Sequence, residues 1–113
     1  MKITEVTNDF FECDDGWNNI IYEALDRIKA LDSNIEVYQI KEKFGGLRIY
    51  LGAYDVKYDD AIEQIILEAE TKAWDTCEKC GQPGTLRNDI GWILTLCDNC
   101  YQEVLERKKN RGY

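Results

Sequence analysis

The stretch IEVYQIKEKFGGLRIYLGAY, residues 35–54, decides the fold of the N-terminal part of the chain. Two runs rich in β-branched and aromatic residues flank Gly45 and Gly46, and such runs favour strands. Two consecutive glycines tolerate the positive φ angles of a two-residue primed turn. We therefore predict a β-hairpin that turns at Gly45-Gly46. The predicted register pairs Phe44 with Leu47, Glu42 with Ile49, Ile40 with Leu51 and Tyr38 with Ala53, on a largely apolar face.

The opposite face of this hairpin is basic and aromatic, whereas the whole chain has a formal net charge of −8. One interpretation is a solvated sheet surface. The other is a cationic cluster of Lys41, Lys43 and Arg48 beside Tyr50, able to hold a phosphate, a nucleotide, nucleic acid or an acidic protein patch. We favour the first, because a two-glycine hairpin needs no ligand to explain it. Glu42 on the apolar face needs a partner, for which Arg48 and Arg87 are the candidates.

Amphipathic helices are expected on both sides of the hairpin. One runs over residues 17–31, where Asp14 or Asp15 can act as its cap, and the other over residues 59–74. A short strand is expected at residues 3–6. Two helices on one face of a hairpin make a modest core. The expected fold class is α+β, with a helix–hairpin–helix body at residues 1–75 and a separate module at residues 76–113.

The separate module carries two cysteine pairs, Cys77-x-x-Cys80 and Cys97-x-x-Cys100, separated by sixteen residues. This spacing is typical of four-cysteine zinc modules, because each tight turn aims two sulfurs at one ion about 2.3 Å away. Four sulfurs close the coordination sphere, so we expect structural zinc. The alternatives are two reduced surface pairs, a redox disulfide, or iron in the same tetrahedron.

The order of elements in the module resembles a treble-clef zinc finger. A metal knuckle is followed by short strands at residues 85–87 and 92–96, and then by a terminal helix. The resemblance implies that Cys97 ends the second strand and that Cys100 lies on the first turn of the helix. The basic residues near 107–111 suit the C-terminal end of a helix.

A second resemblance covers most of residues 16–100. The segment Gln39–Tyr50, with its KEKFGGLR core, and the stretch Cys77–Gly84 resemble a family of small, uncharacterised bacteriophage and prophage proteins. The wider match includes Trp17, residues 69–70, residues 86–87 and residues 91–98. The resemblance implies a protein that works in the host bacterial cytoplasm, and it implies no activity.

Composition limits the function further. The chain has no histidine, so Ser-His-Asp catalysis, Cys-His catalysis and His-ligated zinc hydrolysis are excluded. We expect a non-enzymatic accessory protein that binds a host or phage protein. The phage setting suggests that this binding inhibits a host defence or DNA-handling system. The alternative is nucleic-acid or nucleotide binding by the basic hairpin face.

Two remaining features concern location and the fifth cysteine. No apolar run approaches the roughly 20 residues of a membrane span, and the N-terminal residues lack a signal-peptide core, so a cytoplasmic protein is expected. Cys13 lies among Glu12, Asp14 and Asp15, whose charges would raise the pKa of its thiol. We therefore expect Cys13 to be a partly buried, unreactive side chain.

Overall fold

The computed structural model describes residues 1–110 in an α+β arrangement. Residues 111–113, the end of the predicted zinc module and of the basic tail, lie outside the described residues. The main elements are α1 (Asn18–Leu31), β1 (Val37–Lys43), β2 (Gly46–Leu51), α2 (Asp59–Trp74), β3 (Thr85–Arg87), β4 (Leu94–Leu96) and α3 (Asp98–Asn110). β1 pairs with β2, and β3 pairs with β4, each as an antiparallel two-stranded sheet.

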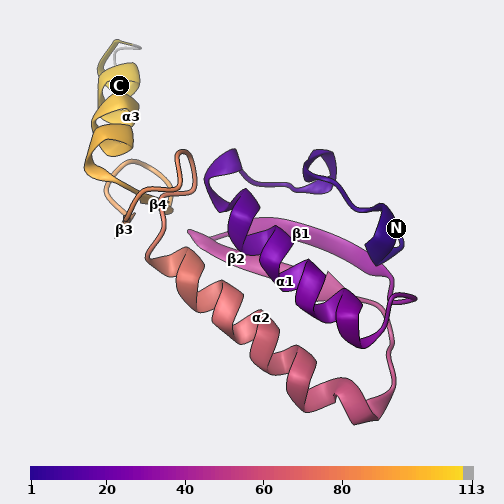
Figure 1. Ribbon diagram of the computed structural model, residues 1–113. Helices are drawn as coiled ribbons and strands as arrows, with labels where there is room; N and C mark the ends of the chain where they lie inside the picture. Colours follow the sequence, from indigo (N-terminus) through magenta and orange to yellow (C-terminus); the bar gives the residue numbers. More distant parts are fainter. Residues whose placement is uncertain (111–113) are drawn as a thin grey trace.

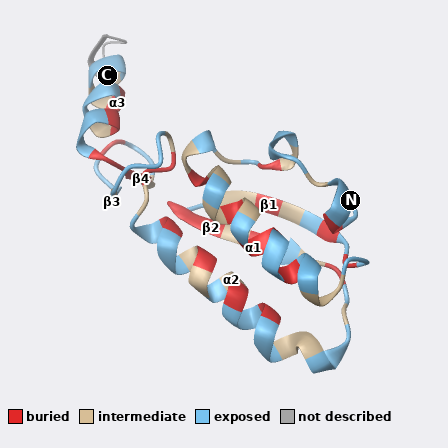
Figure 2. Cartoon of the chain, in the orientation of Figure 1, coloured by how far each residue is buried: buried red, intermediate tan, exposed pale blue. Residues whose placement is uncertain are grey.

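The larger core lies between two helices and the first hairpin. Figure 1 shows α1 and α2 side by side over β1 and β2, with the N-terminal segment along the hairpin. The buried positions on the helices recur at helical spacing and face this core, as Figure 2 shows. The apolar stripes predicted for the two helices are therefore confirmed, although Ile20, Leu31 and Ile66 are only partly buried.

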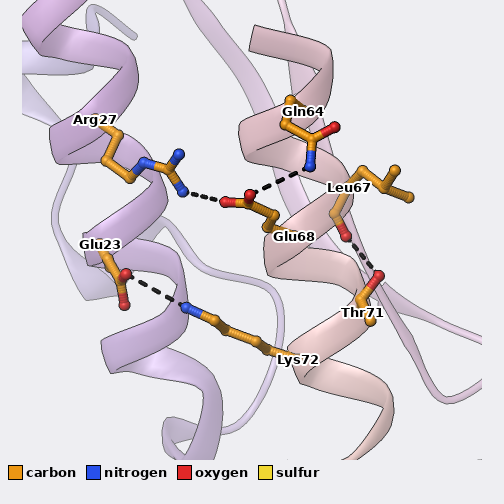
Figure 3. Close-up of polar contacts among 7 residues, drawn as sticks. All are labelled: Glu23, Arg27, Gln64, Leu67, Glu68, Thr71 and Lys72. Atoms are coloured by element: carbon orange, nitrogen blue, oxygen red, sulfur yellow. Dashed lines mark hydrogen bonds and ion pairs between the residues drawn. The ribbon is translucent and has the colours of Figure 1, made fainter. Parts of the chain in front are cut away.

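Ion pairs connect the exposed edges of α1 and α2 (Figure 3). Arg27 pairs with Glu68, and the Lys72 ammonium lies 3.3 Å from Glu23. The hydrogen bond from Arg27 lowers the pKa of Glu68. Exposed pairs of this kind each contribute about 0–1 kcal/mol. The packing of the two helices therefore depends mainly on the apolar side chains beneath these pairs.

The predicted hairpin exists, but its turn begins one residue earlier than expected. Phe44 (φ 53°) and Gly45 (φ 83°) are the central residues, and Lys43 pairs with Gly46. The register consequently pairs Glu42 with Leu47 and Ile40 with Ile49. The predicted pairing of Phe44 with Leu47 is wrong, and the Phe44 ring lies on the surface with 68% of its area exposed.

A β-bulge between Val37 and Gln39 changes the far end of the hairpin. An extra residue in one strand reverses which face the following side chains occupy. As a result Val37 is fully buried, whereas Tyr38 is 67% exposed. The prediction that Tyr38 lies on the apolar face is therefore wrong.

The N-terminal segment is held by turns and not by the strand predicted at residues 3–6. A 3-10 turn spans Ile3–Glu5, and the Ile3 amide donates to the Ile35 carbonyl at 2.9 Å. Farther along, Glu12 forms a parallel bridge to Lys41 of β1. The start of α1 also differs from expectation, because a 3-10 turn at Asp15–Trp17 precedes it and neither Asp14 nor Asp15 makes a side-chain cap.

A smaller core fills the C-terminal part of the described chain. Its buried members are Cys77, Ile90, Leu96, Cys97, Cys100 and Val104. Half of this cluster consists of cysteines, so few aliphatic side chains remain to stabilise β3, β4 and α3. None of the helices in residues 1–110 is both long and apolar enough to cross a membrane.

Candidate metal centre

The four paired cysteines meet in space. The Sγ atoms of Cys77, Cys80, Cys97 and Cys100 all lie within 4.8 Å of one another. The Cys80 and Cys97 sulfurs are 3.5 Å apart, and all four thiols are free of disulfides. Sulfurs bound tetrahedrally at about 2.3 Å would be about 3.8 Å apart. The cluster therefore has the right donor type and size to hold one metal ion.

The first pair lies on a tight turn formed by the backbone. The Gly81 amide donates to the Cys77 carbonyl at 2.9 Å, and the Cys77 amide donates to the Gln82 carbonyl at 2.7 Å. Gly81 has a φ of 83°, a conformation that favours glycine. Gly81 thus allows the chain to reverse directly after Cys80 while the sulfurs of Cys77 and Cys80 both lie in the cluster.

The second pair connects β4 to α3. Cys97 directly follows β4, and Cys100 lies in the first turn of α3. The Cys100 amide donates to the Cys97 sulfur at 3.4 Å, and this hydrogen bond lowers the pKa of Cys97 to about 7. Burial raises the pKa of Cys100. One thiolate therefore forms readily, whereas full ionisation of the cluster needs a bound cation to offset thiolate repulsion.

Arg87 links β3 to the start of α3. Its guanidinium lies 2.6 Å from the Asp98 carboxylate and 4.3 Å from the centre of the Tyr101 ring. The Tyr101 hydroxyl donates to Asp89 at 2.6 Å. This ordered set of contacts holds the helix that carries Cys100. The sequence alone did not single out Arg87 for this role.

The cysteine turn also packs tightly against the segment before α1. The Gly16 amide donates to the Glu78 carbonyl at 2.6 Å, and a Cβ at Gly16 would overlap the carbonyl oxygens of Cys77 and Glu78. The Trp17 side chain is fully buried, and its indole Nε1–H donates to the Thr76 carbonyl at 2.9 Å. The candidate metal centre is therefore attached to the larger core by close contacts.

The glycine turn of the first hairpin makes the other attachment. The buried Thr95 hydroxyl donates to the Gly45 carbonyl at 2.7 Å, and a Cβ at Gly45 would lie 2.6 Å from Leu86 Cδ1. Glu42 accepts a hydrogen bond from the Gly45 amide at 2.6 Å, so the partner of Glu42 is this amide and not Arg48 or Arg87 as predicted. The glycines of the KEKFGGLR segment therefore bring the hairpin into contact with the module that holds the cysteines.

We expect Thr95→Val to destabilise the protein by about 1–3 kcal/mol, because it leaves the buried Gly45 carbonyl without a donor. Urea unfolding of the two proteins measures the difference. Thr71→Val is the matched control, since the Thr71 hydroxyl donates to the Leu67 carbonyl on the exposed side of α2. Its effect should stay within about 0.5 kcal/mol. Equal effects of the two substitutions would contradict the role given to Thr95.

The candidate ligand residues on the hairpin lie on both strands. Lys41 pairs with Arg48 across the strands, and the Lys41 ammonium lies 5.9 Å from the Tyr50 ring centre. Lys43 lies instead at the turn, 5.9 Å from the Phe44 ring centre. Arg48 is half-buried; burial raises the pKa of the nearby Glu70, and the charge of Arg48 offsets part of this rise. The strand register thus places Lys41 opposite Arg48 and near Tyr50, and it places Lys43 two residues farther along β1, beside the turn.

The buried carboxyl of Glu78 and the half-buried thiol of Cys13 lie near the metal centre. Glu78 is 5% exposed; its Oε2 accepts from the Asp14 amide at 3.0 Å, and among the described side chains its Oε1 has no partner. Burial raises the pKa of Glu78 to about 7. Burial, followed by the charge of Glu78, raises the pKa of the half-buried Cys13 to about 12. The direction predicted for Cys13 is therefore confirmed, with burial as the larger cause.

Cys13 should consequently react slowly with iodoacetamide. With a pKa of about 12, its thiolate fraction at pH 8 is on the order of a thousandfold below that of an ordinary cysteine. The alkylation rate should rise about tenfold per pH unit between pH 7 and 10. Peptide mass spectrometry of the folded protein measures it, and denatured protein is the control. Rapid modification of Cys13 at pH 7 in the folded chain would contradict this assignment.

Comparisons with protein-family models, curated proteins and solved structures find no match for this chain.

Proposed function

We propose that the four-cysteine cluster binds one structural zinc ion in a treble-clef-like module. The observation that carries the proposal is the meeting of four free sulfurs within 4.8 Å. The position of Cys100 on the first turn of α3 supports the treble-clef comparison. Zinc is the metal that four thiolates most commonly hold in structural sites, and four sulfurs leave no position for water or substrate. The zinc therefore stabilises the fold and takes no part in chemistry.

We further propose that the protein has a non-enzymatic role. The chain has no histidine, and its net charge of −8 opposes binding to nucleic acid at long range. The phage-type resemblance of the hairpin and cysteine segments supports a setting in the host bacterial cytoplasm. The protein then acts as an accessory factor that binds a host or phage protein, and inhibition of a host defence or DNA-handling system is the effect this setting favours.

Affinity capture from bacterial lysate tests the proposed binding role. The bait is the tagged, zinc-loaded chain, and the Cys97→Ser chain is the matched control. The proposal expects one or a few proteins that the zinc-loaded bait recovers at stoichiometric levels and the control does not. Recovery of no protein above the control would contradict it.

A second candidate is nucleotide or nucleic-acid binding by the hairpin face. The cross-strand pairing of Lys41 with Arg48 beside Tyr50 is the observation that favours it. Bases stack on aromatic rings, and phosphates pair with adjacent cations. Titration with a fluorescent oligonucleotide at low salt should then show binding that Lys41→Glu weakens and the distant Lys29→Glu does not. The absence of binding at low salt would remove this candidate.

A further inference from the structure

A concave site beside the candidate metal centre has no role in the two sites considered above. It is a groove of about 520 Å³ between the cysteine turn, the loop before β4 and the outer turns of α3. Sites for small ligands and side-chain anchors typically measure about 300–1,000 Å³. The groove is therefore large enough to take one large side chain and its neighbours from a binding partner.

Three apolar side chains line the groove. Trp92 and Leu94 line it from the β4 side, and Val104 lines it from α3. Trp92 leaves 52% of its surface exposed, more than either of the other two tryptophans, Trp17 and Trp74. Exposed tryptophan at the edge of a concave apolar site is a frequent anchor of protein interfaces. A large apolar group would find a complementary surface here.

Cationic side chains, here called the rim, also line the groove. Lys79, Arg107 and Lys108 line it together with one carboxylate, Asp14. Asp14 lies 3.5 Å from the Lys79 ammonium and pairs with it. Within the part of the chain that the structure describes, Arg107 and Lys108 pair with no carboxylate. In a chain with a net charge of −8, this local positive rim favours an acidic ligand.

We infer that this groove docks a short acidic peptide segment of a partner protein, with one large apolar side chain against Trp92 and flanking Asp or Glu residues on Arg107 and Lys108. The inference rests on the proposed protein-binding function and names the surface that carries it. A nucleotide fits less well, because a polyphosphate gathers its negative charge at one end, whereas the groove has cations on two elements, Lys79 on the cysteine turn and Arg107 and Lys108 on α3. Carboxylates spread along a peptide reach the separate cations of the rim one by one.

Selection from a random displayed peptide library, with the zinc-loaded chain as target, tests the inference. The enriched peptides should share an aromatic or large aliphatic residue flanked by acidic residues. Fluorescence anisotropy with one labelled enriched peptide should show binding at least about tenfold weaker for Trp92→Ala and for the double variant Arg107→Glu/Lys108→Glu. Raised salt should also weaken the binding.

Matched controls separate the groove from other surfaces. Leu67→Ala removes another exposed apolar side chain, and Lys29→Glu reverses another exposed charge, both on the helical body. These variants should bind the peptide as the parent does. Circular dichroism and zinc content should show that Trp92→Ala is folded, since this side chain is half exposed.

Several outcomes would overturn the inference. They are no enrichment of peptides, enriched peptides without the acidic and apolar pattern, binding that survives both groove variants, or displacement of the peptide by ADP. The lysate capture distinguishes this failure from that of the proposed function. If Trp92→Ala captures the same proteins as the parent chain, the groove is not the docking site, although the protein-binding function is retained. If the parent chain captures no protein, the proposed protein-binding function is wrong.

Discussion

Cys97→Ser should lower the free energy of unfolding by more than about 4 kcal/mol and unfold the C-terminal part of the chain. Structural zinc contributes about 10–16 kcal/mol of binding free energy in small modules of this kind, and that free energy is available only to the folded state. The smaller core contains few aliphatic side chains besides the cysteines. It cannot hold β3, β4 and α3 in place once the metal is lost.

Guanidinium unfolding of the zinc-loaded parent, the chelator-treated parent and Cys97→Ser measures this effect. Cys13→Ser is the matched control, because it changes the one cysteine outside the cluster. We expect the chelated parent and Cys97→Ser to behave alike, and Cys13→Ser to stay within about 1 kcal/mol of the parent. Similar unfolding curves for Cys97→Ser and Cys13→Ser would contradict a structural metal.

Trp17→Ala should cost about 3–5 kcal/mol, the range observed when a large buried aromatic side chain is removed from a core. Trp17 is fully buried at the junction of the larger core with the cysteine turn, where its indole donates to the Thr76 carbonyl. Trp17→Phe keeps most of the apolar volume and loses only the donor, so about 1–3 kcal/mol is expected. Trp92→Ala should change stability by about 0.5 kcal/mol or less, because Trp92 is half exposed.

The rate of zinc release is a second measurement for Trp17→Ala, and it tests whether Trp17 also stabilises the metal centre. Because Trp17 and Gly16 contact the backbone of the cysteine turn, Trp17→Ala should speed the transfer of zinc to a chromogenic chelator. Trp92→Ala should leave that rate unchanged. A Trp17→Ala protein that is destabilised but releases zinc at the parent rate would show that Trp17 stabilises only the larger core.

The features predictable from the sequence are those that depend on local pattern. The helix predicted over residues 59–74 has the bounds of α2, because a repeated apolar stripe specifies it without help from distant residues. The cysteine cluster was likewise expected from spacing, because two tight turns with two thiols each have few other arrangements. The α+β class follows from the same local signals.

The hairpin register was not predictable in this way. A positive φ is uncommon for phenylalanine, so two adjacent glycines suggested a Gly45-Gly46 turn. The structure places Gly46 in β2, where a Cβ would lie 2.7 Å from the Trp74 ring. Gly45 lies against Leu86 of the other hairpin. Both glycines are therefore required by close contacts with residues far along the chain, which local sequence does not reveal.

The attachments of the metal centre were missed for the same reason. Gly16 and Thr95 look ordinary in the sequence, and their importance comes from contacts with Glu78 and Gly45. A small residue directly before a tryptophan is a weak signal for close packing, and a lone threonine in a strand is none. Long-range contacts of this kind become visible only when the elements are placed in space.

Zinc K-edge X-ray absorption, combined with metal analysis of the purified and reduced chain, tests the central claim most directly. We expect one zinc ion per chain, with four sulfur neighbours at about 2.3 Å. A sample that holds no stoichiometric metal, or a metal with oxygen or nitrogen neighbours in place of some sulfurs, would contradict it.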